Sequence, residues 1–285
     1  MDQLSIKGHA KINLFLNIKN LREDGYHNLE MVMQSIELHD NLIISAAKRG
    51  IDIETNSSEI PTGVNNLVYK AAARVIEKSN FSNGLKIFIE KNIPVAAGLA
   101  GGSADAAAVI KGINTFFDLD LDEKELFNIA REVGSDVSFC MRPGTAYVTG
   151  KGDQLQYLNP LKTRKVILVK PPVMVSTKKI YELYDKRDND INIPVEKLLE
   201  NIKKGDELKI KDGWANVLEP VTKDVVKDIE EIENILINKG FKFTLMSGSG
   251  PTVFSLVEKG KEKLAKKLVA NWTRNQDFIT LTKTI

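Results

Sequence analysis

Residues 94–107 read Pro94-Val95-Ala96-Ala97-Gly98-Leu99-Ala100-Gly101-Gly102-Ser103-Ala104-Asp105-Ala106-Ala107. The residues before them, 85–90, alternate between apolar and polar and predict a strand, and the alanine-rich run after them predicts a helix over 103–117. Glycines and alanines let a ligand approach the backbone, and the start of a helix points free N–H groups into the bend. This arrangement suits a phosphate group.

Two well-known phosphate-binding loops do not match this stretch. A Walker A loop needs Gly-Lys-Ser or Gly-Lys-Thr, which occurs nowhere in the chain. A dinucleotide-binding fingerprint starting at Gly98 would place Ala100 and Ser103 at its second and third glycine positions, so it fails. The His-Arg-Asp loop of protein kinases is also absent. Taken alone, the stretch is explained equally well by a tight strand-to-helix turn.

Three further fragments contain polar residues in patterns that fit a phosphate-transfer site. Lys11 and Asn13 point to the same face of an otherwise apolar strand predicted over 4–18. Asp136 follows a predicted helix, and Gly-Ser-Gly-Pro stands at 248–251 between two predicted strands. Each fragment has an ordinary explanation by itself: an exposed strand face, a turn or N-cap aspartate, and a hairpin turn.

Together, and in this order, the four fragments resemble the motif set of the GHMP kinases, the family of galactokinase and of homoserine, mevalonate and phosphomevalonate kinases. The resemblance implies an α+β, two-domain GHMP kinase fold. Its N-terminal domain is ribosomal-protein-S5-domain-2-like, its C-terminal domain is a ferredoxin-like α/β domain, and the active site lies in the cleft between them. We therefore expect one domain at 1–158, with the catalytic residues and phosphate loop, and a second at 159–285.

Two more fragments narrow the resemblance within the family. Asp24-Gly25-Tyr26-His27 and Gly150-Lys151-Gly152-Asp153 are similar to the branch that acts on a cytidine diphosphate methylerythritol. The resemblance implies ATP-dependent phosphorylation of the 2-hydroxyl of 4-diphosphocytidyl-2-C-methyl-D-erythritol, in the non-mevalonate isoprenoid precursor pathway. It also implies ATP and Mg²⁺ as the cofactors of the reaction.

The resemblance implies site residues position by position. The expected catalytic pair is Lys11 and Asp136, and the expected metal ligand is Ser103. The expected ATP-binding residues are Asn65 and the loop residues Pro94, Val95, Ala96, Ala97, Gly98, Leu99, Ala100, Gly101, Gly102, Ser103 and Ala104. The expected substrate-binding residues are Asn13, Tyr26, His27, Tyr181 and Gly248.

The expected chemistry gives the catalytic pair its roles. An alcohol is a poor nucleophile unless its proton is removed as the new bond forms, so Asp136 is the expected general base. Lys11 is expected to offset the charge on the transferred phosphoryl group.

The chain departs from the family pattern in two places. Ala96, Ala97 and Ala100 stand where family members have glycines, which restricts the backbone angles. We expect the loop to function, and a shift in its path stays open. Residues 31–34 read Met-Val-Met-Gln, where relatives often have a second aromatic that would stack on cytosine.

Composition excludes several other classes of protein. The chain has 285 residues, 42% of them apolar, and a net charge of +2, which is too small to favour a nucleic acid or an anionic membrane as partner. A single cysteine, Cys140, excludes an intrachain disulfide and a four-cysteine zinc site. The N-terminus lacks a signal-peptide pattern. We expect a cytoplasmic enzyme with small-molecule partners, as a monomer or weak homodimer.

Three alternatives remain open at this stage. The nearest is another small-molecule GHMP kinase, of the mevalonate or homoserine type. The others are a nucleotide-binding protein that has lost catalysis and a nucleic-acid-binding module. Among the local predictions, residues 42–47 and 51–55 form a strand pair joined around Gly50, and 221–239 form one helix.

Overall fold

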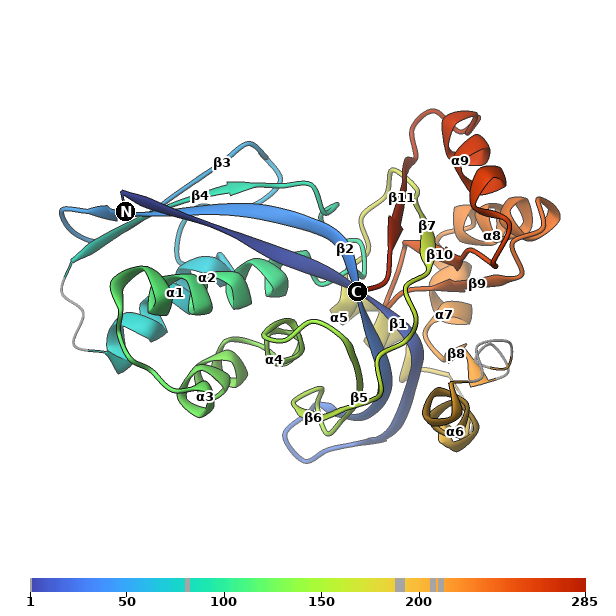
Figure 1. The fold of residues 1–285 in the computed structure, drawn as a ribbon. Helices are drawn as coiled ribbons and strands as arrows, with labels where there is room; N and C mark the ends of the chain where they lie inside the picture. The colour runs from blue at the N-terminus through green and yellow to red at the C-terminus, as the bar shows by residue number, and fades with distance from the viewer. Residues whose placement is uncertain (1, 80–82, 188–192, 206–208, 210–212) are drawn as a thin grey trace. The chain divides into compact units, whose positions relative to one another are not determined.

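The computed structural model describes residues 2–79, 83–187, 193–205, 209 and 213–285 (Figure 1). The chain divides into two compact units built from interleaved segments. Unit 1 comprises Met1–Ala10, Leu38–Val95 and Ala100–Pro143, and unit 2 comprises Lys11–Glu37, Ala96–Leu99 and Gly144–Ile285. The predicted domains, 1–158 and 159–285, are instead two consecutive ranges, and this division stays a prediction.

Unit 1 combines a sheet with four helices. Its strands and helices are the first part of β1 (Gln3–Leu21), the end of β2 (His27–Ala47), β3 (Ile51–Thr55), β4 (Gly84–Glu90), α1 (Leu67–Lys78), α2 (Gly101–Phe117), α3 (Glu123–Val133) and α4 (Ser135–Cys140). Helices α1 and α2 pack against each other and against the apolar side chains of the strands. The capping box predicted at Asp122 and Glu125 is present at the start of α3.

The predicted pairing of 42–47 with 51–55 is wrong. Strand β4 lies between them: β2 pairs with it antiparallel, with Asn41 opposite Glu90, and β3 pairs with it parallel, with Ile51 opposite Leu85. The side chains of Leu85, Ile87 and Ile89 are fully buried. Because β4 carries this apolar face, the central position in the sheet buries more of it than an edge position would.

Unit 2 contains two groups of paired strands and the remaining helices. In one group, β1 pairs parallel with β8 (Ala215–Asn216), and β2 pairs antiparallel with β5 (Thr145–Thr149), which pairs with β6 (Gln154–Tyr157). The other group is an antiparallel sheet of order β11-β7-β10-β9, made of β7 (Lys165–Lys170), β9 (Phe243–Met246), β10 (Val253–Leu256) and β11 (Phe278–Lys283). The helices are α5 (Thr177–Tyr184), α6 (Glu196–Lys204), α7 (Glu219–Val225), α8 (Asp228–Asn238) and α9 (Glu262–Ala270).

One helix prediction needs correction. The helix predicted over 221–239 is two helices, α7 and α8, separated at Val226, whose backbone is extended at φ −134° and ψ 89°. Two adjacent β-branched valines lower helix propensity at this point. Asp136, for which a turn and a helix N-terminus were both open, lies in the first turn of the short helix α4. None of the helices in the described part of the chain is long and apolar enough to cross a membrane.

Candidate active site

Lys11 lies on β1 in unit 2 and is almost fully buried, with 4% of its surface exposed. Its Nζ donates hydrogen bonds to Asn13 Oδ1 at 2.6 Å and to the carbonyl oxygen of Gly98 at 3.1 Å. The residue between them, Ile12, is fully buried. The prediction that Lys11 and Asn13 share one face of the strand is therefore confirmed.

The carbonyl of Gly98 joins three segments that are far apart in the sequence. It accepts a second hydrogen bond from Ser247 Oγ at 3.0 Å, and Ser247 Oγ in turn accepts one from the backbone N–H of Asn13 at 3.3 Å. The backbone N–H of Lys11 donates to the carbonyl of Leu99 at 3.1 Å. The structure therefore brings together three of the four predicted fragments: the Lys11 strand, the middle of the loop and the Gly248 turn.

Two glycines are required in this cluster. Gly98 has φ +72°, and a Cβ at its position would lie 2.2 Å from the carbonyl oxygen of Ser247. Gly248 has φ +58°, and a Cβ there would lie 3.3 Å from Lys11 Nζ. Left-handed backbone and close approach both favour glycine, so these positions depend on the absence of a side chain.

The Gly248 turn is held by residues that sequence reasoning missed. Asn216 Nδ2 donates to the carbonyl oxygens of Met246 and Gly248, both at 2.8 Å. Thr222 Oγ1 donates to the carbonyl of Ser249 at 3.2 Å. No sequence pattern marks these residues, because an asparagine or a threonine by itself indicates no role.

A lysine and two glutamates lie behind the same turn; we call them the Lys223 cluster. Lys223 Nζ bridges Glu219 Oε1 at 2.7 Å and Glu233 Oε2 at 2.5 Å, and Glu219 Oε2 accepts the backbone N–H of Met246 at 2.9 Å. Burial raises the pKa of Glu233 to about 7. Glu233 Oε1 is buried without a hydrogen-bond partner among the described residues.

The predicted phosphate loop comprises residues 94–104, and its second half starts α2 in unit 1. Ala100 is the N-cap residue at φ +57°, and the N–H of Ala104 already donates to the carbonyl of Ala100 at 2.9 Å. The N–H groups of residues 101–103 come before this first intrahelical bond, so they are the donors that remain for a ligand. The hydroxyl of Ser103 is half-buried and has no hydrogen-bond partner in the described part of the chain.

The alanines that replace glycines behave in different ways. Ala96 and Ala100 adopt the left-handed backbone, at φ +50° and +57°, which costs an alanine about 1 kcal/mol or more at each position. The side chain of Ala97 is buried, as is that of Leu99. Buried side chains thus anchor the loop and hold two of its alanines in conformations that glycine would adopt freely.

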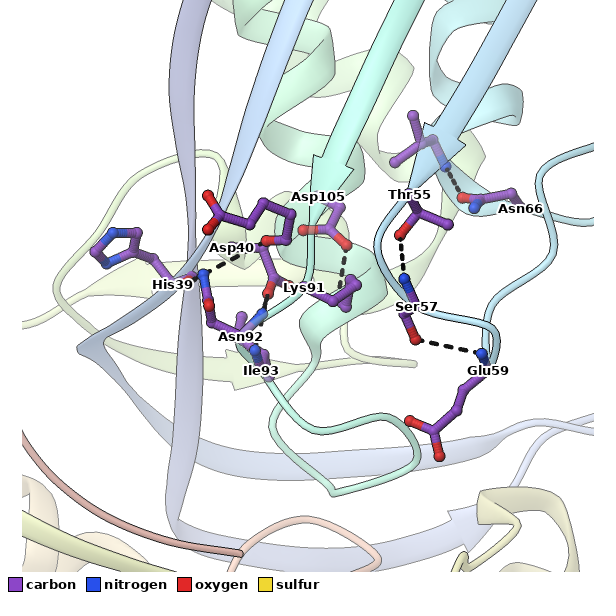
Figure 2. Close-up of polar contacts among 12 residues, drawn as sticks. His39, Asp40, Thr55, Ser57, Glu59, Asn66, Lys91, Asn92, Ile93 and Asp105 are labelled. Carbon is purple, nitrogen blue, oxygen red and sulfur yellow. Dashed lines mark hydrogen bonds and ion pairs between the residues drawn. The ribbon is translucent and has the colours of Figure 1, made fainter.

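Unit 1 contains a second cluster of one lysine and two carboxylates, the Lys91 cluster (Figure 2). Lys91 Nζ contacts Asp40 Oδ2 and donates to Asp105 Oδ2 at 2.9 Å. Asp40 Oδ1 accepts the backbone N–H groups of Asn92 at 2.5 Å and Ile93 at 2.8 Å. Burial raises the pKa of Asp105 to about 8. Sequence reasoning passed over these residues.

Unit 1 also contains the predicted general base, Asp136, and the predicted ATP-binding residue Asn65. Asp136 is half-buried in the first turn of α4, after Gly134. Asn65 is exposed, and its neighbour Asn66 is the N-cap of α1, accepting from the N–H of Val68 at 2.8 Å. Asn66 therefore takes the capping role, and Asn65 lies exposed beside it. Its contact with ATP, and the pairing of Asp136 with Lys11, stay predictions.

Two of the predicted cytidine-binding residues lie together in unit 2. The rings of His27 and Tyr181 are 5.3 Å apart at their centroids, tilted by 35°, and His27 Nε2 is 2.7 Å from Asp185 Oδ1. The ring of Tyr26 is 59% exposed and instead lies 5.7 Å from Lys151 Nζ.

Asn13 and Met31 form a further contact in unit 2. Asn13 Nδ2 donates to Met31 Sδ at 3.5 Å. Met31 belongs to the segment where the family resemblance leads one to expect a second aromatic, and it instead supplies a buried thioether that packs against a predicted substrate-binding residue.

Comparison with known proteins identifies the class of protein first. The family model described as GHMP kinases N terminal domain matches residues 66–144, and that described as GHMP kinases C terminal matches residues 198–274. The chain is therefore a small-molecule kinase with the GHMP kinase fold, as predicted, and its α+β class is confirmed.

Individual relatives define the family further. The chain is 42% identical to the 4-diphosphocytidyl-2-C-methyl-D-erythritol kinase of Acetivibrio thermocellus, over 92% of this chain and 93% of the relative. It is 39% identical to that of Clostridium acetobutylicum, over 99% and 100%. The chain belongs to the family of the 4-diphosphocytidyl-2-C-methyl-D-erythritol kinases.

Solved structures agree with this family. A crystal structure of a 4-(cytidine 5'-diphospho)-2C-methyl-D-erythritol kinase is 30% identical, covers 99% of this chain and 100% of its own, and superposes with a TM-score of 0.80. The homoserine kinase of Cytophaga hutchinsonii is 18% identical, with 100% and 95% covered and a TM-score of 0.78. The second likeness shows a shared fold only.

Proposed function

We propose that the chain transfers the γ-phosphoryl group of ATP to the 2-hydroxyl of 4-diphosphocytidyl-2-C-methyl-D-erythritol, a step of the non-mevalonate isoprenoid precursor pathway. The observation that carries the proposal is the cluster around the Gly98 carbonyl. There the Lys11 amine and the Ser247 hydroxyl converge on one carbonyl of the phosphate loop. The names of the relatives support the choice of substrate.

Asp136 is the proposed general base. Its carboxylate takes the proton of the 2-hydroxyl while the hydroxyl oxygen bonds to the γ-phosphorus and the bond from that phosphorus to the β–γ bridging oxygen breaks. The products are the 2-phosphorylated alcohol and ADP. A half-buried position on a short helix gives this carboxylate access to a ligand together with a fixed backbone.

Lys11 is the proposed source of positive charge for the transferred group. The hydrogen bonds from its Nζ to Asn13 Oδ1 and the Gly98 carbonyl fix the direction of the amine before any ligand binds. A preorganised cation of this kind stabilises developing charge without reorganising during the reaction. The proposal gives Asn13 the parallel role of orienting the amine and contacting the substrate.

The residues present fit a Mg²⁺ ion that enters with the nucleotide. Mg²⁺ in kinases takes one or two protein ligands and completes its shell with phosphate and water. The described part of the chain contains no group of three or more His, Cys, Asp or Glu side chains placed to hold a metal by themselves. The unpartnered hydroxyl of Ser103 would hold the ion, which when bound would neutralise charge between the β- and γ-phosphates.

The cytidine end of the substrate is assigned to His27 and Tyr181. Their neighbouring rings offer an aromatic surface and a polar edge, which together suit a pyrimidine. Asp185 holds the His27 ring through Nε2, so the orientation of that ring is set within the protein. In the proposal, Tyr26 adds a further exposed ring at the rim.

The proposal is tested by an ADP-release assay with Mg-ATP and each of four alcohols: the cytidine substrate, mevalonate, homoserine and galactose. ³¹P NMR of the product then shows which hydroxyl carries the new phosphate. Turnover with the cytidine substrate alone is the expected result. Turnover with mevalonate or homoserine instead would replace the substrate and keep the phosphate-loop chemistry.

A further inference from the structure

The Lys91 cluster connects three elements of unit 1 at the two flanks of the phosphate loop. Asp40 is on β2, Lys91 follows β4 directly before the loop, and Asp105 is in the second turn of α2 directly after it (Figure 2). Their side chains are 0%, 7% and 3% exposed. No ligand can reach carboxylates so deeply buried, so the two aspartates act on other parts of the protein.

The flank before the loop is fixed through its backbone. Asp40 Oδ1 accepts two successive N–H groups, those of Asn92 and Ile93, at 2.5 and 2.8 Å. The other oxygen of the same carboxylate contacts Lys91 Nζ. One buried carboxylate thus holds the chain direction at the point where it leaves the sheet.

The flank after the loop is fixed through the same amine. Lys91 Nζ donates to Asp105 Oδ2 at 2.9 Å, and it lies so close to the start of α2 that a Cβ at Gly101 would be 3.2 Å from it. The N–H groups of residues 101–103 are the free donors of this helix. Their direction therefore depends on where Lys91 holds the first turns of α2.

We propose that Asp40, Lys91 and Asp105 are positioning residues for the nucleotide, which clamp the two flanks of the loop at a fixed separation and so aim its N–H donors. This inference rests on the proposed function for the identity of the ligand. It predicts that a change in the clamp weakens binding of the phosphates of ATP and leaves binding of the alcohol substrate unchanged. A merely structural role would weaken both equally.

The test compares Lys91→Met, Asp105→Ala and Asp105→Asn with the unchanged enzyme, using Mg-ATP as the probe. Lys86→Met is the matched control, because Lys86 on the adjoining strand β4 makes an exposed ion pair with Glu54 at 2.8 Å. Dissociation constants for Mg-ATP are measured by calorimetry, without any alcohol present. KM for each substrate and the unfolding temperature are measured on the same samples.

The expected result is a loss of ATP affinity of about 10-fold or more in Lys91→Met and Asp105→Ala, with the KM of the alcohol unchanged, because small displacements of positioned groups have effects of this size. Asp105→Asn keeps an oxygen that accepts from Lys91, so it should stay within about 3-fold of the unchanged enzyme. Lys86→Met should bind ATP normally. Hydrogen exchange of the loop amides should rise in the two disrupted variants alone.

Several outcomes overturn the inference. The first is normal ATP binding in Lys91→Met and Asp105→Ala. The second is an equal rise in KM for ATP and for the alcohol, together with a fall in unfolding temperature. If Lys91→Met does not fold, the comparison of Asp105→Ala with Asp105→Asn decides by itself. Equal ATP affinities in these two variants would contradict the proposal. A protein that binds ATP but fails to phosphorylate the cytidine substrate refutes the proposed function while the ATP comparison still tests the clamp. A protein that does not bind ATP refutes both.

Discussion

The Lys91 cluster of unit 1 and the Lys223 cluster of unit 2 have the same composition, one lysine between two carboxylates. In each, one carboxylate accepts backbone N–H groups next to a loop of the candidate site: Asp40 does so before the phosphate loop, and Glu219 before the Gly248 turn. The two clusters differ in depth. The side chain of Lys91 is 7% exposed, whereas that of Lys223 is 25% exposed.

The acid in the more deeply buried cluster also has the more strongly raised pKa. Burial raises the pKa of Asp105 to about 8 from an ordinary 3.8, and that of Glu233 to about 7 from 4.5. Removing one partner from a deeply buried ion pair leaves a charge without solvent, which is more costly than the same change near the surface. Similar charge clusters therefore lie next to both loops, and the one beside the predicted phosphate loop is the more deeply buried.

The largest expected effects are losses of kcat in variants of the two proposed catalytic residues, which belong to neither charge cluster. Asp136→Ala should lower kcat by about 10²–10⁴-fold, the usual contribution of a general base, with ATP affinity near normal. Lys11→Met should lower kcat by about 10²–10³-fold, because it removes a preorganised charge. Steady-state kinetics with direct ATP binding measure both. Near-normal kcat in Asp136→Ala would remove the base assignment, and a rise in KM alone in Lys11→Met would make Lys11 a binding residue.

The next effect tests whether Gly98 is required because of close packing as well as because of its left-handed backbone. Gly98→Ala should reduce the free energy of unfolding by about 3 kcal/mol or more, because its Cβ would lie 2.2 Å from the Ser247 carbonyl oxygen. Gly50→Ala is the matched control, with a similar φ of +73° and no atom within 4 Å of the added Cβ. It should cost only about 1 kcal/mol. Equal losses in urea unfolding would show that backbone conformation alone sets the requirement.

A smaller effect concerns the cytidine end, which neither charge cluster supports. His27→Ala should raise KM for the cytidine substrate about 10-fold and leave KM for ATP unchanged, because it removes one ring of the pair with Tyr181. Asp185→Asn keeps the ring and an acceptor for it, so its effect should be smaller. An equal rise in both KM values would place His27 outside the cytidine site.

The smallest expected effect is a pH dependence of the stability of the protein, which arises from Glu233 in the Lys223 cluster. A buried acid whose folded pKa is raised stabilises the protein fully below its unfolded pKa and loses that contribution as pH rises to the folded value. Glu233 should therefore make the protein progressively less stable as pH rises from about 4.5 to about 7. Urea unfolding across this range should show a shallower decline in Glu233→Gln. An unchanged slope would assign the decline to other groups.

Much of the candidate site follows from local patterns. The two-residue spacing of Lys11 and Asn13 places them on one face of a strand whatever the fold around them, because strand side chains alternate. The glycines of the loop and turn mark close backbone approach, and both Gly98 and Gly248 adopt left-handed backbone. Membership of the GHMP kinases followed from these motifs, and comparison with known proteins confirmed it.

Of the two predictions that failed, one concerns long-range strand pairing and the other a local break in a helix. The 42–47 and 51–55 strands read as a hairpin because a turn separates them, yet β4 lies between them. The 221–239 segment reads as one helix because its apolar periodicity continues through Val226, where the backbone is extended. In the first case the local pattern was compatible with two arrangements, and burial of the apolar face of β4 selected one of them. In the second case the two adjacent valines at 225 and 226 lower helix propensity locally.

Residue types at short spacing are enough to predict the class of the protein, the phosphate loop, the Gly248 turn and the residues proposed for catalysis. The groups that hold these segments in place become visible only in the folded chain. Asn216, Glu219 and the Lys91 cluster carry no local signature, since an acid, an amide or a lysine reads as a solvated surface residue until folding buries it. Burial gives such groups their partners, and it is a property of the whole chain.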